Sequence, residues 1–149
     1  MSVQTIGRGV PETPRPAGQA ILLCDQAITE TGTNKLTLVG IFDRIFDQTL
    51  PIVYSRPAVV YARVTDAQGQ YAFRLDLVRL DDDQTIGRIE LPFTLADRIA
   101  SYNLLFPIND MRFERPGDYE FRLFADSRYV GGMRLYVLQI NQPQGGGSP

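Results

Sequence analysis

The sequence predicts an all-β protein that folds as a mostly antiparallel β-sandwich of about eight strands. Three observations support this prediction. Apolar and polar residues alternate over several stretches, as in Tyr71-Ala-Phe-Arg-Leu-Asp-Leu77, which is the period of a strand with one buried face. Short segments rich in Gly, Asp, Asn and Pro, which favour turns, separate these stretches. The segment Thr94–Ser101 is the one place that suits a helical turn, and it is too short to make a helix layer.

The chain divides by composition into one domain with two loose ends. Residues 1–18 contain three prolines and few large apolar groups, so we expect a flexible arm there. Residues 19–140 are expected to form the sandwich, because 149 residues correspond to one compact unit. Residues 141–149 are rich in Gly, Gln and Pro, which predicts a flexible tail. Strands are expected near residues 19–26, 35–43, 57–65, 70–80, 85–95, 101–108, 118–125 and 128–140.

Three of these strands contain residues that strands disfavour. Gly40 interrupts an apolar run, which indicates a bulge or a point where another group approaches the backbone closely. Gly131-Gly132 suggests the same in the last strand. Pro92 lacks the N–H that a central strand needs, so its strand is expected to be interrupted or to lie at a sheet edge.

The segment Arg115-Pro-Gly-Asp-Tyr119 refines the prediction of a sandwich. It places a turn directly before a tyrosine that opens an alternating strand. Immunoglobulin-like sandwiches have a tyrosine at this place, with its ring in the core and its hydroxyl bonded to nearby backbone. Phe121 stands where antibody domains have a cysteine, and the chain has no tryptophan. We therefore predict an immunoglobulin-like sandwich that is not of the antibody type.

Several segments of the chain resemble a family of small bacterial proteins that is catalogued as a domain of unknown function. The most specific is the block Leu-Val-Gly-Ile-Phe-Asp-Arg-Ile at residues 38–45. The others are Cys24-Asp25-Gln26, Gly32-Thr33-Asn34-Lys35 and Pro116-Gly-Asp-Tyr-Glu-Phe121. The resemblance covers roughly residues 18–140. It implies a compact β-sandwich and a bacterial origin, and it brings no activity or catalytic residues.

The composition excludes the common catalytic sites. The chain has no histidine, so it has no Ser-His-Asp triad, Cys-His pair or histidine zinc site. Cys24 is the one cysteine and follows Ile21-Leu-Leu in an expected buried strand, so we interpret it as a core thiol. The acidic residues lie mostly in turns rather than along a groove that would suit a glycosidase. We predict that the protein is not an enzyme and has no cofactor.

Charge and hydropathy limit the classes of partner. The net charge of −2 offers no field that would attract nucleic acid. The start of the chain lacks the pattern of a signal peptide, and no apolar run approaches the roughly 20 residues that cross a bilayer. A lone cysteine also suits a reducing compartment. We therefore expect a cytoplasmic protein that binds neither nucleic acid nor membrane.

Acidic loops at one end of the sandwich suggest a ligand-binding alternative. If the strands run alternately up and down, the loops that hold Asp81, Asp82, Asp83 and Asp110 share one end. Loop carboxylates of this kind supply oxygen ligands for calcium, and such an end also suits carbohydrate. Arginines fall at the same end and no fixed calcium-loop spacing is present, so we favour a solvated hairpin tip.

Surface chemistry favours a protein-interaction role. Tyrosine and arginine are enriched at protein interfaces, and the chain mixes them at Tyr54, Arg56, Tyr129 and Arg134. The terminal arm offers a further route, since a β-prone segment such as Val3-Gln-Thr-Ile6 can add to a neighbour's sheet edge. The sequence thus predicts a non-catalytic interaction or structural module with an unidentified protein partner. Self-association into a homo-oligomer through strand faces or arms is the form we consider first.

Overall fold

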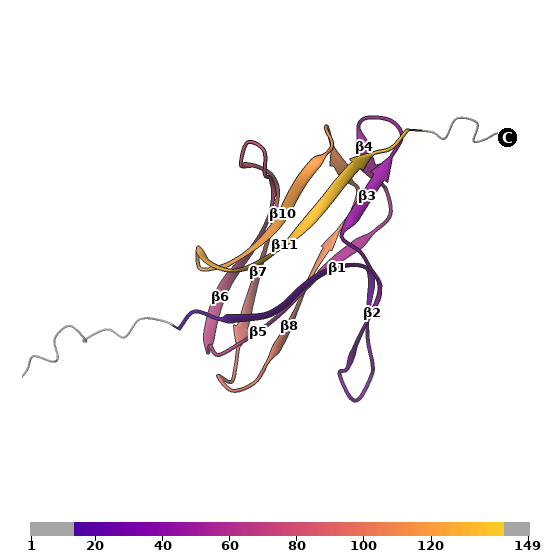
Figure 1. Cartoon of the computed structure of the whole chain (residues 1–149). Coiled ribbons are helices and arrows are strands. Elements are labelled where there is room, and N and C mark those ends of the chain that lie inside the picture. The colour runs from indigo at the N-terminus through magenta and orange to yellow at the C-terminus, as the bar shows by residue number, and fades with distance from the viewer. Residues whose placement is uncertain (1–13, 142–149) are drawn as a thin grey trace, which may run out of the picture.

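A computed structural model describes residues 14–141, which fold into two β-sheets packed face to face (Figure 1). The predicted fold class is confirmed, since these residues form strands and turns and no helix. The same residues therefore hold no helix long and apolar enough to span a membrane. The strands are β1 (Ala17–Thr29), β2 (Leu36–Ile41), β3 (Arg44–Asp47), β4 (Ile52–Tyr54), β5 (Ala58–Thr65), β6 (Gly69–Arg79), β7 (Gln84–Leu95), β8 (Tyr102–Ile108), β9 (Met111–Phe113), β10 (Gly117–Ala125) and β11 (Arg128–Gln139).

The order of the strands is that of an immunoglobulin-like sandwich. One sheet has the order β2-β1-β5-β8 and the other has the order β3-β11-β10-β6-β7, with β4 and β9 paired beside them. In the lettering used for immunoglobulin domains, β1, β5 and β8 correspond to strands A, B and E of one sheet. In the other sheet, β7, β6, β10 and β11 correspond to strands C′, C, F and G. All pairs are antiparallel except β3 with β11. The expected strands all form, and β3, β4 and β9, which are short, were not predicted.

The core lies between the two sheets, on the faces that the alternating pattern predicts. Tyr71 and Phe73 on β6 and Tyr119 and Phe121 on β10 are all at most 3% exposed. The facing sheet contributes aliphatic residues such as Val60 on β5, together with the ring of Phe106 on β8. Aromatic and aliphatic groups of both sheets thus fill the core, and the one cysteine forms no disulfide.

Tyr119 forms the expected link between ring and backbone. Its ring is fully buried and meets the ring of Phe113 edge-on, with 4.8 Å between centroids. Its hydroxyl donates a 2.7 Å hydrogen bond to the carbonyl oxygen of Arg115, four residues earlier. The bond fixes the turn between β9 and β10 against the core.

The strand positions with unusual residues behave as expected. Pro92 lies on β7, an edge strand of its sheet, where the missing N–H leaves no ladder bond unmade. The pairing of β10 with β11 shifts register next to Val130, and a side chain at Gly132 would meet the carbonyl oxygen of Phe121 at 2.9 Å. Gly40 has φ of +70° and approaches Asp25 closely.

The β1–β2 hairpin extends beyond the area where the two sheets overlap. The first half of β1 pairs with β5 and its second half pairs with β2, so the hairpin leaves the sandwich at its lower right in Figure 1. Its turn is closed by a hydrogen bond from Glu30 N to Lys35 O and contains Gly32 and Asn34 at positive φ. Because one face of the hairpin has no facing sheet, Val39 and Ile41 stay 42% and 56% exposed.

The expected arm and tail fall mostly outside the described residues. β1 begins at Ala17, two residues before the predicted strand, so Ala17 and Gly18 pair with β5 rather than belonging to an arm. Pro14 is also placed, since its carbonyl oxygen accepts a 2.8 Å bond from the Tyr71 hydroxyl. The remaining arm residues 1–13 and tail residues 142–149 are not described.

We predict that Tyr119→Phe lowers the free energy of unfolding by about 1–2 kcal/mol, because it leaves the Arg115 carbonyl without its buried donor. The change removes one oxygen and keeps the ring, so the core packing stays. Urea denaturation measures the loss, and Tyr129→Phe at the half-exposed Tyr129 is the control. Equal stabilities of the two variants would show that the hydroxyl contributes nothing to the fold.

Candidate functional site

The predicted interaction residues Tyr54 and Arg56 lie together at the end of β4, against β1. The Tyr54 hydroxyl donates a hydrogen bond to Asp25 on β1. The Arg56 guanidinium donates a 2.9 Å bond to the same hydroxyl and lies 3.6 Å from the Asp25 carboxylate. Burial raises the pKa of Tyr54, and the hydrogen bond to Asp25 raises it further. The three side chains thus form a small polar cluster at the base of the β1–β2 hairpin.

A recess with a volume of about 330 Å³, lined by apolar residues and by Asp25, Arg44 and Arg56, adjoins this cluster, and we call it the hairpin-base recess. Its walls include Ile41, Phe46 and Val53, which are 56%, 60% and 39% exposed. Leu138 on β11 pairs with Phe46 on β3 and is also partly exposed, which extends the apolar surface. Exposed apolar groups that gather next to a Tyr–Arg pair are typical of a protein contact.

Tyr129 and Arg134, the other two predicted interaction residues, lie apart from this recess on β11. Tyr129 is 48% exposed and meets Phe124 edge-on, with 5.7 Å between ring centroids. Arg134 sits opposite Glu120 and lies 3.5 Å from the Asp118 carboxylate. The structure therefore joins Tyr54 with Arg56 but does not bring the four residues into one patch.

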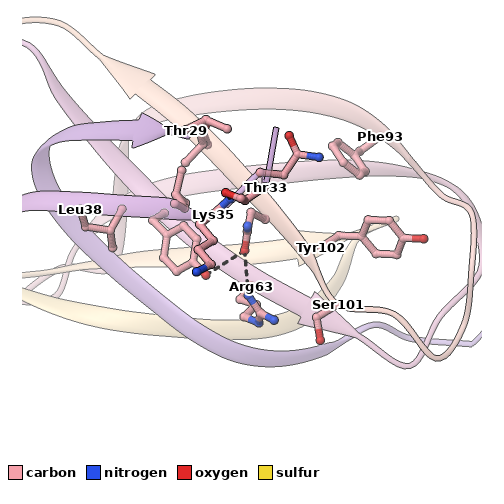
Figure 2. A pocket seen from close by; sticks show the side chains of 13 residues that line it. Thr29, Thr33, Lys35, Leu38, Arg63, Phe93, Ser101 and Tyr102 are labelled. Atoms are coloured by element: carbon pink, nitrogen blue, oxygen red, sulfur yellow. Dashed lines mark hydrogen bonds between the residues drawn. The ribbon is translucent and has the colours of Figure 1, made fainter. Parts of the chain in front are cut away.

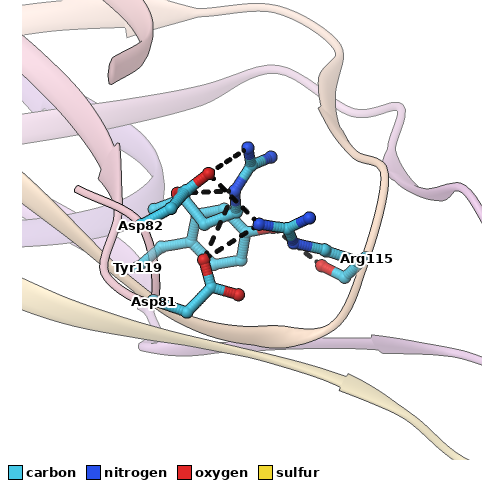
Figure 3. A network of polar contacts seen from close by, with 5 residues as sticks. Asp81, Asp82, Arg115 and Tyr119 are labelled. Carbon is cyan, nitrogen blue, oxygen red and sulfur yellow. Dashed lines mark hydrogen bonds and ion pairs between the residues drawn. The ribbon is translucent and has the colours of Figure 1, made fainter. Parts of the chain in front are cut away.

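The acidic turn between β6 and β7 is bound by arginines (Figure 3). Arg79 forms two hydrogen bonds to the Asp82 carboxylate, of 3.0 and 2.9 Å. Arg115 reaches Asp81 at 3.0 Å and Asp82 at 3.2 Å, while its carbonyl accepts the Tyr119 hydroxyl. We call this group, Arg79, Asp81, Asp82, Arg115 and Tyr119, the corner network.

The remaining acidic residues of this end do not join the corner network. Asp83 lies 3.2 Å from Arg122 on β10. Asp110 is instead part of the lining of a small cavity near Met111 and Arg112. Across residues 14–141, no group of three or more His, Cys, Asp or Glu side chains is arranged to hold a metal ion.

Asp76 is a charged residue that the sequence pattern did not single out. It is 4% exposed although it lies on the outward face of β6. Arg88 on β7 binds its two oxygens at 2.9 and 3.3 Å, and Arg74 lies 3.2 Å away. Arg74 in turn stacks 4.3 Å above the ring of Phe124. The arginines cover and neutralise Asp76, which makes it a structural rather than a reactive carboxylate.

Cys24 is buried and lies on β1, as expected for a core thiol. Burial raises the pKa of its thiol, and the negative charge of Asp25 raises it further. The thiol donates to the carbonyl oxygen of Gln26 at 3.5 Å. A raised pKa keeps the sulfur protonated and unreactive near neutral pH.

A second and larger cavity, which the sequence pattern did not indicate, lies beside the hairpin (Figure 2). It is an open groove with a volume of about 910 Å³, and we call it the hairpin groove. The hairpin forms one wall, and outward-facing residues of β5 and β8 form another. The lining residues are Thr29, Thr33, Asn34, Lys35, Leu36, Leu38, Tyr61, Arg63, Phe93, Ser101, Tyr102, Asn103 and Leu105.

We predict that Gly40→Ala destabilises the protein more than Gly32→Ala. Both glycines have positive φ, and an alanine there costs about 1–2 kcal/mol in backbone strain. A side chain at Gly32 meets open space, whereas one at Gly40 overlaps the Asp25 carboxylate that Tyr54 and Arg56 hold in place. Chemical denaturation of both variants measures the difference, and equal losses would show that the contact with Asp25 carries no constraint.

We predict a pH-dependent effect of Asp82→Asn. Hydrogen bonds from Arg79 lower the pKa of Asp82 from 3.8 to about 2. A pKa that is lower in the folded state than in the unfolded state stabilises the protein at pH values above 3.8, the ordinary pKa of the group. This contribution is lost as the pH falls through about 2. The melting temperature of the variant should therefore lie below wild type at pH 7 and approach it near pH 2. Sodium chloride at about 1 M should also reduce the difference at pH 7, because it screens exposed ion pairs. A gap that is the same at every pH would exclude this ion pair as its cause.

Comparison with known proteins identifies the family of the chain but assigns it no activity. No curated protein matches it. Among solved structures it is similar to an immunoglobulin-like protein from Pseudomonas aeruginosa, with 11% sequence identity and a TM-score of 0.40. That match covers 86% of this chain and 100% of the other. The model of a family of unknown function, DUF6941, matches residues 19–138. The resemblance seen in the sequence is thus confirmed, and the chain belongs to this family of unknown function.

Proposed function

We propose that the protein is a non-catalytic interaction module that pairs, through the open edge of β2, with β2 of a second copy of itself. The observation that carries this proposal is the character of β2 as an edge strand. An unpaired edge presents backbone N–H and C=O groups that pair with another strand unless the edge is protected. Among the edge strands of the two main sheets, β2 is the one with neither a proline nor a charged residue.

The other edge strands each carry a feature that discourages pairing. β8 contains Pro107, and β7 contains Pro92 together with charged residues. β3 is four residues long and begins and ends with the charged residues Arg44 and Asp47. Prolines, charges and short length are the ways in which proteins protect exposed edges.

β2 has none of these features. Its sequence, Leu-Thr-Leu-Val-Gly-Ile, contains no charge and no proline over residues 36–41. Val39 and Ile41 remain exposed on it, and Ile28 of β1 is exposed on the same face. Antiparallel pairing with the same strand of a second copy joins the two four-stranded sheets and covers part of this apolar face.

The chemistry of the described residues supports a role without catalysis. Cys24 is buried with a raised pKa, and the carboxylates of the corner network and Asp76 are bound by arginines. The hairpin-base recess lies next to the β2 edge, since Ile41 belongs to both. Its apolar groups therefore extend the surface available to a partner strand.

We predict that wild-type protein is a dimer in solution and that Val39→Lys with Ile41→Lys makes it a monomer. Two lysines on each β2 place like charges next to one another and remove apolar contact. Size-exclusion chromatography with light scattering at about 10–100 µM, where mass action favours association, measures the mass.

The control replaces an equally apolar residue away from the edge. Ile99 lies in the turn between β7 and β8 and is 87% exposed, so Ile99→Lys should remain a dimer. Thermal melting checks that each variant is folded. A monomeric wild type across this range, or a dimer that survives both lysines, would contradict the proposal.

A further inference from the structure

We propose that the hairpin groove binds an acidic, extended peptide segment of a partner protein, with the acidic side chains at Lys35 and Arg63. This site is separate from the β2 edge. It lies between the hairpin and the outward face of β5 and β8 (Figure 2). On β5, Tyr61 and Arg63 alternate with core residues and so point away from the core.

Charge is the first argument. The groove is lined by two cations, Lys35 from the hairpin and Arg63 from β5, and by no carboxylate. Neither cation has a carboxylate within 4.0 Å among residues 14–141, whereas arginines elsewhere in that range, such as Arg79, Arg88 and Arg115, do. Glu30, the acid of the hairpin turn, accepts a bond from Thr33 and does not line the groove. Two uncompensated cations facing one cavity favour an anionic ligand.

The position of Arg63 is fixed by neutral groups. Its Nε donates to the Gln19 amide oxygen at 3.1 Å, and one terminal nitrogen donates to the Asn103 amide oxygen at 3.3 Å. The Tyr61 hydroxyl donates to the same Asn103 oxygen at 2.8 Å. Amide oxygens orient the guanidinium without neutralising it, so its charge and remaining N–H donors stay available to a ligand.

The rest of the lining suits a peptide rather than a small ion or a nucleic acid. Leu36, Leu38 and Leu105 provide apolar wall, and Thr29 and Ser101 add hydroxyl groups at the rim. An extended peptide alternates its side chains, so acidic residues can meet the cations while the intervening apolar residues pack on the leucines. Nucleic acids need many phosphate contacts, and the groove offers two cations.

Fluorescence anisotropy tests the proposal with a labelled short peptide of alternating glutamate and valine, and with its lysine–valine counterpart. We expect the acidic peptide to bind and the basic one not to bind. Lys35→Glu with Arg63→Glu should weaken binding by about tenfold or more, since it replaces attraction with repulsion. Added salt should weaken the binding of the wild type.

Matched variants separate the groove from general charge. Arg98→Glu changes an exposed arginine outside the groove and should leave the affinity unchanged. Lys35→Gln with Arg63→Gln tests the same contacts without added negative charge, should the double reversal melt early. The β2 variant Val39→Lys with Ile41→Lys should still bind the peptide, which keeps this test distinct from that of the dimer.

Four results would overturn the proposal. They are no binding of the acidic peptide to wild type, equal binding of the basic peptide, an unchanged affinity in the folded groove variants, and an equal loss in Arg98→Glu. Dodecanoate, a small amphiphilic carboxylate, serves as the competing probe. If it binds the groove and the peptide does not, the site belongs to a small ligand instead.

Discussion

The burial of the Tyr119 ring with its hydroxyl fixed to the Arg115 carbonyl is the contact on which the arrangement of this protein depends. The bond draws the β9–β10 turn onto the core, and the turn carries the Arg115 side chain to the acidic residues of the β6–β7 turn. One buried side chain therefore joins turns from different parts of the chain. Because Arg79 and Arg115 bind Asp81 and Asp82, these carboxylates are already engaged in contacts within the protein.

The corner network divides the molecule into a fixed end and a more open one. At the fixed end, arginine side chains bind the exposed acidic residues of the loops (Figure 3). At the other, the β1–β2 hairpin leaves the area of sheet contact and keeps apolar and cationic side chains accessible. Interactions with other molecules are therefore best sought at the hairpin, where Lys35 and Arg63 face the groove without a carboxylate in its lining and Val39 and Ile41 stay exposed.

The sequence predicted the sandwich well because its signal is local. Alternation and turn residues are properties of adjacent positions, so the long strands and the burial of Tyr71, Phe73, Tyr119 and Phe121 were all expected and confirmed. The short strands β3, β4 and β9 were not predicted, since three or four residues are too few to show the alternation of apolar and polar residues. Their existence depends on partners distant in the chain, as in the pairing of β4 with β9.

The sites were predicted less completely, for a related reason. Tyr54 ends β4 and Arg56 follows two positions later, so their contact is local, whereas Tyr129 and Arg134, which the sequence grouped with them by residue type, lie elsewhere on β11. The hairpin groove combines Lys35, Arg63 and Asn103, which come together through the bend of the hairpin and the order of the strands. The available signal was that Lys35 is the one lysine of the chain, which alone does not reveal what faces it.

The hairpin presents its two candidate surfaces on different sides. In the pairing of β1 with β2, Ile28, Val39 and Ile41 share one face, while Leu36 and Leu38 lie on the other face and line the groove. A partner strand at the β2 edge therefore need not displace a peptide from the groove. Only the groove depends on the position of the hairpin relative to β5 and β8, because its walls come from all three. Pairing at the edge needs β2 itself, so the two surfaces can be occupied independently of one another.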